Sequence, residues 1–192
     1  MQLEQAGTYI LHRLETELPP ALHYHNAAHT RNVYKAAKQL GEAEGITGDE
    51  LTMLLTAAYY HDCGFLVKVK GHEEESCRIA RDILPGFGYN TTETDRICGM
   101  IMATRLPQSP QNHLEEILAD ADLDYLGRED FFIVGDKLFA ENLLAGTIKN
   151  REEWDCAQVA FITNHRYFTK SAINLREAKK EANLERVKAQ QN

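Results

Sequence analysis

The chain has 192 residues, of which 43% are hydrophobic and 26% are charged, and its formal net charge is -8. This composition is that of an ordinary folded globular protein and excludes a disordered chain, and the length predicts a single domain over residues 1–192. The acidic balance argues against a nucleic-acid polymer or an anionic membrane as partner, because both need basic surface. It remains compatible with a small phosphorylated substrate.

Neither the cysteines nor the N-terminal sequence suggests an oxidising or membrane environment. The four cysteines are dispersed without C-x-x-C spacing, so neither a zinc knuckle nor a redox pair is expected. The sequence shows no basic and apolar leader, and no apolar run is long enough to span a membrane. The expected location is therefore cytoplasmic.

Apolar residues recur at helical spacing along nearly the whole chain. The expected helices lie at about 3–18, 26–40, 51–62, 72–84, 92–104, from 114 onward, 131–139, 151–165 and 173–189. No stretch shows the period of two that is typical of a strand, so the predicted fold class is all-α. The last helix is charged and alanine-rich, and we expect it to be solvated and to fray.

A histidine-rich segment separates the first two expected helices. Three of the eight histidines stand close together, at His23, His25 and His29. If the helix begins with Asn26 as its N-cap, only His29 lies on it; if it begins earlier, His25 and His29 share a face. Both arrangements allow the two rings to converge on one site.

The third helix ends in the adjacent pair His61 and Asp62. Its apolar pattern predicts a buried helix, so the pair lies at the inner end of a core element. A buried carboxylate is costly without a cation or hydrogen-bond donors, which makes a metal ion an economical partner. The simpler alternative is a histidine bonded to a backbone carbonyl and an aspartate that helps to end the helix.

Further polar residues follow at the borders of the later helices. His72 opens the fourth helix, and Arg105 begins a proline-bounded loop that either lies over a pocket or simply crosses the surface. Asp120, Asp122 and Asp124 alternate along the sixth, and alternate positions of a helix cannot share one face. One aspartate is therefore a candidate ligand, while the others cap, orient neighbours or meet solvent.

The order His29, His61-Asp62, Asp122 resembles that of the HD superfamily of metal-dependent phosphohydrolases, over roughly residues 25–127. The resemblance implies an HD-domain-like helical bundle in which these four residues hold one divalent metal ion. Mixed imidazole and carboxylate ligands suit Mn, Fe, Co, Ni or Zn and, less tightly, Mg. The resemblance also leaves room for a second metal, and it implies hydrolysis of a small phosphoester, such as a nucleotide or cyclic nucleotide.

Two carboxylates compete for the last ligand position. The family's apolar approach ending in Ala-Asp matches Ala121-Asp122, which favours Asp122 over Asp120. Asp120 is then expected to lie just behind the ligands.

The segment Tyr24-His25-Asn26 with His29 also resembles the Y-H-N-x-x-H segment of cyclic-nucleotide phosphodiesterases. There the first histidine is the general acid toward the leaving oxygen, a role that would fall to His25. We expect Asn26 and Arg105 to contact the substrate.

His72 resembles the family's downstream His-Glu element and is expected to face the substrate as a further catalytic residue. Asp62 is expected to help orient the attacking water as well as to bind metal.

Two alternatives remain open: a non-catalytic metal-binding regulatory module, and an HD-type oxygenase with two irons, which needs additional histidine ligands. The pair Phe131-Phe132 and Trp154 are interpreted as core residues.

Overall fold

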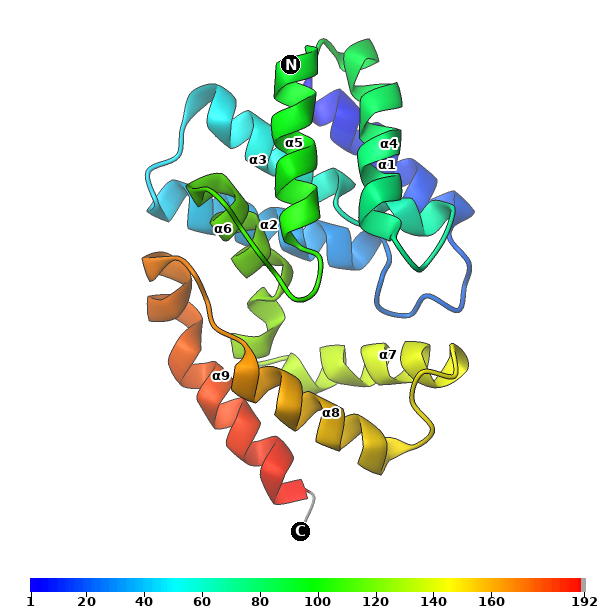
Figure 1. Cartoon of the computed structure of the whole chain (residues 1–192), viewed down its shortest axis with the longest axis vertical. Coiled ribbons are helices and arrows are strands. Elements are labelled where there is room, and N and C mark those ends of the chain that lie inside the picture. The colour runs from blue at the N-terminus through cyan, green and yellow to red at the C-terminus, as the bar shows by residue number, and fades with distance from the viewer. Residues whose placement is uncertain (191–192) are drawn as a thin grey trace.

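The computed structural model describes residues 1–190, and these are helical with no strand (Figure 1), which confirms the all-α prediction. The first part comprises α1 (Leu3–Glu17), α2 (Ala27–Ala43), α3 (Gly48–Tyr60), α4 (His72–Ile83), α5 (Thr91–Ala103) and α6 (His113–Asp122), with the 3₁₀ helices η1 (Cys63–Leu66) and η2 (Leu84–Phe87). The second part comprises η3 (Asp124–Gly127), α7 (Phe131–Leu144), α8 (Arg151–Asn164) and α9 (Lys170–Gln190). Within residues 1–190, no helix is long and apolar enough to cross a bilayer.

Two apolar clusters lie in the two parts of the chain. The larger is formed by α1 to α6, where small residues such as Ala37 and Ala58 allow α2 and α3 to approach closely. The smaller is formed by η3, α7, α8 and α9 around Leu126, Phe131 and Ile162. In Figure 1, α7, α8 and α9 lie together beneath the first six helices. Residues near the end of α6 and in η3 therefore lie where the two parts meet.

Asparagine side chains cap the N-termini of four helices. The side chains of Asn26, Asn90, Asn112 and Asn150 each accept hydrogen bonds from the first turn of the helix that follows. Two helices begin earlier than their apolar pattern predicts. α3 begins at Gly48 and α9 at Lys170. The apolar pattern identifies only the helical turns that pack against the core, whereas the helical backbone can begin several residues earlier.

The last helix is not the solvated, fraying segment that its composition suggests. Ala172, Asn183 and Val187 of α9 are fully buried. Asn183 donates from its side-chain amide to the carbonyls of Leu126 and Arg128, 3.0 and 3.1 Å away. The prediction was wrong for residues 173–189 because a few buried positions and polar anchors hold a helix whose other positions are charged. The last two residues of the chain lie outside the described part.

Candidate metal centre

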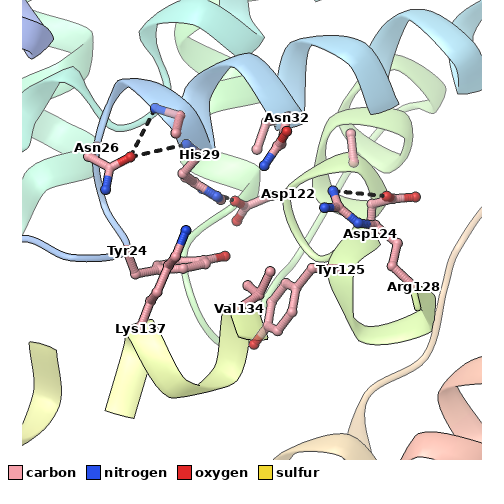
Figure 2. A pocket seen from close by; sticks show the side chains of 13 residues that line it. Tyr24, Asn26, His29, Asn32, Asp122, Asp124, Tyr125, Arg128, Val134 and Lys137 are labelled. Atoms are coloured by element: carbon pink, nitrogen blue, oxygen red, sulfur yellow. Dashed lines mark hydrogen bonds and ion pairs between the residues drawn. The ribbon is translucent and has the colours of Figure 1, made fainter. Parts of the chain in front are cut away.

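Four side chains from three helix ends converge between α2, α3 and α6. His29 lies in the first turn of α2, which Asn26 caps by accepting from the amides of Ala28 and His29 (Figure 2). His61 and Asp62 follow the last residue of α3, and Asp122 is the last residue of α6. The site is thus built at helix ends, where the backbone turns and side chains project into the space between packed helices.

The distances between these side chains fit the coordination shell of one ion. His29 Nε2 lies 3.2 Å from His61 Nε2 and 3.2 Å from Asp122 Oδ1. Asp62 Oδ2 lies 3.4 Å from His29 Nε2 and 3.2 Å from His61 Nε2. Ligands about 2.0–2.2 Å from a metal stand roughly 3.0–3.5 Å apart when they are neighbours. Ligand atoms of His29, His61 and Asp122 all lie within 4.8 Å of one another, and Asp62 adds a fourth that reaches both imidazoles.

A second observation also points to a cation. Asp62 Oδ2 is buried and has no hydrogen-bond partner within the described residues. His61 Nδ1 lies 2.9 Å from the carbonyl of Ala58 and donates to it, so the neutral ring directs the Nε2 lone pair towards that carboxylate. A lone pair facing a carboxylate at this distance is repulsive unless a proton or a metal ion lies between them. The donor set therefore fits the divalent ion that the sequence predicts.

The pKa shifts describe the same electrostatic balance. Burial raises the pKa of Asp122, but the imidazoles of His29 and His61 outweigh it and lower the pKa to about 2. Burial lowers the pKa of His61, but the carboxylates of Asp62 and Asp122 outweigh it and raise the pKa well above its usual value. The carboxylates are therefore ionised at neutral pH, and a metal competes with protons for the two imidazoles.

The other two aspartates of the alternating set bind different partners. Asp120 is fully buried and accepts from the backbone amides of Phe168 and Thr169 at 2.9 and 2.8 Å and from the Thr169 hydroxyl at 2.7 Å. Asp124 pairs with Arg176 of α9, with 2.6 Å between Oδ1 and Nε. Asp120 thus anchors the connection from α8 to α9, which corrects the expectation that it supports the ligands.

This arrangement predicts a contrast between two matched substitutions. Loss of a residue that only supports a ligand typically lowers metal affinity by about 10–100-fold. Asp122→Asn should lower it further, because it removes the charge of a ligand itself. Asp120→Asn should keep metal affinity within a few-fold but lower the free energy of unfolding by about 1–3 kcal/mol, since the amide nitrogen would face the N–H of Phe168 or the two donors of Thr169. Metal titration calorimetry and thermal unfolding separate the two effects. The reverse order of metal affinities would transfer the ligand role to Asp120.

The metal cluster opens into a cleft of about 640 Å³ that His25, Asp62, His72 and Arg105 all help to line. The structure thus brings the expected catalytic residues to one cavity, although their roles stay predictions. Arg105 is half exposed and pairs with Glu74, with 2.6 Å between Nη1 and Oε1, so it lies at the rim.

Asn26 is the N-cap of α2, one of the two arrangements that the sequence left open. Its amide oxygen caps α2, and its nitrogen donates to the carbonyls of Leu22 and His23 at 3.3 and 2.8 Å. Both ends of the side chain are therefore engaged with local backbone. A substrate contact by Asn26 stays a prediction, whereas the positioning of His29 follows directly from the cap.

His72 approaches the centre from α4. Its Nδ1 donates to the carbonyl of Val69 at 3.0 Å, and its Nε2 lies 3.3 Å from Asp62 Oδ1. Gly64 makes this approach feasible, because a Cβ at that position would lie 1.9 Å from the carbonyl oxygen of His72. Asp62 therefore directs one oxygen to the imidazoles of His29 and His61 and the other to His72.

Glu141 on α7 is a site residue that the sequence did not predict. Its Oε1 pairs with Nδ1 of His25, and its Oε2 accepts from the backbone amides of Tyr24 and His25 at 2.9 and 3.1 Å. Burial raises the pKa of Glu141, but the bonds from these donors outweigh it and the pKa lies below its usual value. An ionised Glu141 fixes the orientation of the His25 ring. α7 also carries Asp136, Lys137 and Asn142, so its sequence does not single out Glu141.

Comparisons with known proteins agree with this geometry. A model of the HD domain matches residues 26–124, which is more than half of the chain. A solved structure from an uncultured Thermotogales bacterium, described as a predicted HD superfamily hydrolase, is 19% identical with a TM-score of 0.65, covering 98% of this chain and 90% of its own. A solved structure from Lactobacillus plantarum is 18% identical with a TM-score of 0.66, covering 98% of this chain and 96% of its own. At these identities the likeness shows a shared fold. No curated protein sequence matches the chain at a significant level.

Proposed function

The chain belongs to the HD domain family, and from this premise we propose that it is a metal-dependent hydrolase of small phosphoesters. The observation that supports this most strongly is the buried, unpartnered oxygen of Asp62 beside two imidazoles and Asp122. A divalent ion held by His29, His61, Asp62 and Asp122 would supply Lewis-acid activation of water and compensation of phosphate charge.

The chain's own residues divide the remaining work. Asp62 directs Oδ1 away from the two ligand imidazoles and towards the cleft side, where His72 faces it at 3.3 Å. In this position the carboxylate can accept a hydrogen bond from the attacking water and fix its direction. The Nδ1 of His72 is already bonded to Val69, so its Nε2 is the ring atom that a phosphate oxygen would contact, in exchange for its present partner Asp62 Oδ1.

His25 is the group that protonates the leaving oxygen. Glu141 occupies its Nδ1, which leaves Nε2 for proton transfer, and the ring lines the cleft. The Phe65 ring stacks on it with centroids 4.3 Å apart and also stacks on His72 at 4.1 Å. A carboxylate and an aromatic face therefore hold the imidazole in one orientation, which an effective general acid requires.

The rim of the cleft supplies positive charge for an anionic substrate. Lys70 and Arg105 line the cavity on the side of His72. Lys70 offsets locally the net charge of -8, which would otherwise repel phosphate, and Arg105 would do so by exchanging Glu74 for the phosphate. Nucleotides and cyclic nucleotides are the phosphoesters that the sequence favours, and they belong in the first substrates tested.

Purified protein should be stripped of metal, reloaded with single divalent ions, and assayed against phosphomonoesters and phosphodiesters. We expect metal-dependent release of phosphate or of a phosphomonoester with at least one ion. Turnover that survives complete metal removal would contradict the proposal, and silence with every ion would favour the regulatory module instead. The di-iron oxygenase needs histidine ligands for a second ion, and beside the group of His29, His61 and Asp122 the described site offers His72, 3.3 Å from Asp62.

A further inference from the structure

The cleft continues from the metal centre between η3, α7 and α8, and there its walls are apolar. The side chains that line this far part are those of Leu123, Leu126, Leu138, Trp154, Phe161 and Ile162. The mouth carries two more apolar residues, Val69 and Leu106, which are 63% and 57% exposed. Apolar surface so exposed beside a charged centre suits a ligand with an apolar part.

Two of the polar side chains that line the cleft, Asn142 and Thr104, are engaged within the protein. Asn142 donates to the carbonyl of Leu138 at 2.9 Å and accepts from the hydroxyl of Thr147 at 2.7 Å. Thr104 donates to the carbonyl of Ile101 at 2.8 Å. On α8 the wall adds two polar groups, the amide of Gln158 and the indole N–H of Trp154, which is buried and has no hydrogen-bond partner within the described residues. A nucleobase presents several donors and acceptors and would leave most of them unpaired in such walls, which costs binding free energy.

From these walls we infer that the substrate is a phosphoester of an apolar alcohol, with an extended alkyl or aromatic group seated between α7 and α8. The inference rests on the proposed function for the phosphate group of the substrate. It adds the chemical class of the alcohol to which that phosphate is esterified. The phosphate lies at the end bounded by His25, His72 and Arg105, and the apolar group extends past Leu138 towards Trp154. Nucleotides, which the sequence favours, are then poorer substrates.

Trp154 makes the occupancy of the cleft measurable without turnover, because it is the single tryptophan of the chain and is part of the wall. Metal-loaded protein should be titrated with n-alkylphosphonates from ethyl to octyl while the Trp154 fluorescence is recorded. We expect the Kd to fall about threefold or more for each added methylene until the cleft is filled. Octylphosphonate should bind more tightly than adenosine monophosphate. The matching alkyl phosphates should show the same slope in kcat/KM.

Two wall variants and one control make the test specific. Leu138→Gln should flatten the dependence on chain length, whereas Gln158→Leu should steepen it, so the two changes act in opposite directions. Leu144→Gln alters a leucine of the same helix that is 64% exposed and lies outside the cleft, and should leave the slope unchanged.

The outcomes separate this inference from the proposed function. A Kd independent of chain length, or tighter binding of the nucleotide than of octylphosphonate, overturns the inference even if phosphoesters are hydrolysed. A clear slope in fluorescence supports it even if no phosphoester is turned over, a result that would count against the hydrolase alone.

Discussion

Replacing His61 or Asp62 by alanine is expected to remove bound metal and activity together. His61 is 1% exposed and Asp62 7%, so either change leaves a buried, half-compensated cluster in which the remaining charges are unpaired. We expect metal content to fall from near one ion per chain to background after dialysis, and activity to fall below detection. Elemental analysis of the dialysed protein and a phosphate-release assay are the measurements.

His12→Ala is the matched control, because His12 is an exposed histidine of α1, outside the site. It should retain both metal and activity. Full metal occupancy in the His61 or Asp62 variant would show that these residues are not ligands.

The second large effect is expected from His25→Ala, which should keep the metal but lower kcat by about 10²–10⁴, the range for a lost proton-transfer group. The loss should depend on the leaving group. A nitrophenyl ester departs without needing a proton, so the variant should recover much of its rate there while remaining slow on an alkyl ester. Steady-state kinetics on the two esters, with metal content measured in parallel, tests this.

Glu141→Gln refines the same prediction. The amide keeps the size of the side chain but loses the charge that pairs with Nδ1 of His25. We expect a smaller fall in kcat than for His25→Ala, with the same dependence on the leaving group and with metal retained. Equal losses on both esters would assign His25 and Glu141 to substrate positioning, and loss of metal in His25→Ala would make His25 a ligand.

Periodicity was sufficient to predict the helices, because each carries an apolar stripe and several begin at an asparagine cap. It predicted α9 as a helix but not its docking, which depends on single contacts such as that of the Asn183 amide with the carbonyl of Leu126 in η3. Trp154 shows a related limit. It is 7% exposed, as expected for a core residue, yet it also lines the cleft, and burial alone does not distinguish the two situations.

The site was predictable where residue order carries information. The His-Asp pair at the end of an apolar helix already suggested a buried cation, and the resemblance of the order His29, His61-Asp62, Asp122 to the HD superfamily implied the remaining ligands. Glu141 was out of reach because it stands 116 positions from His25, and no local pattern links the two. The separate partners of Asp120 and Asp124 depend likewise on the packing of α9, which the apolar pattern of α6 does not encode.

The alternation of Asp120, Asp122 and Asp124 creates a thermodynamic linkage between the ion and the C-terminal helices. The two outer residues hold the start and the middle of α9, and the central residue belongs to the metal centre. Gly127 strengthens the connection, since a Cβ there would lie 2.5 Å from the carbonyl oxygen of Arg176. An ion at 100 times its Kd stabilises the native state by about 2.7 kcal/mol. Because this short segment carries both a candidate ligand and the anchors of α9, we expect chelation to weaken the docking of α9 as well as to empty the metal centre.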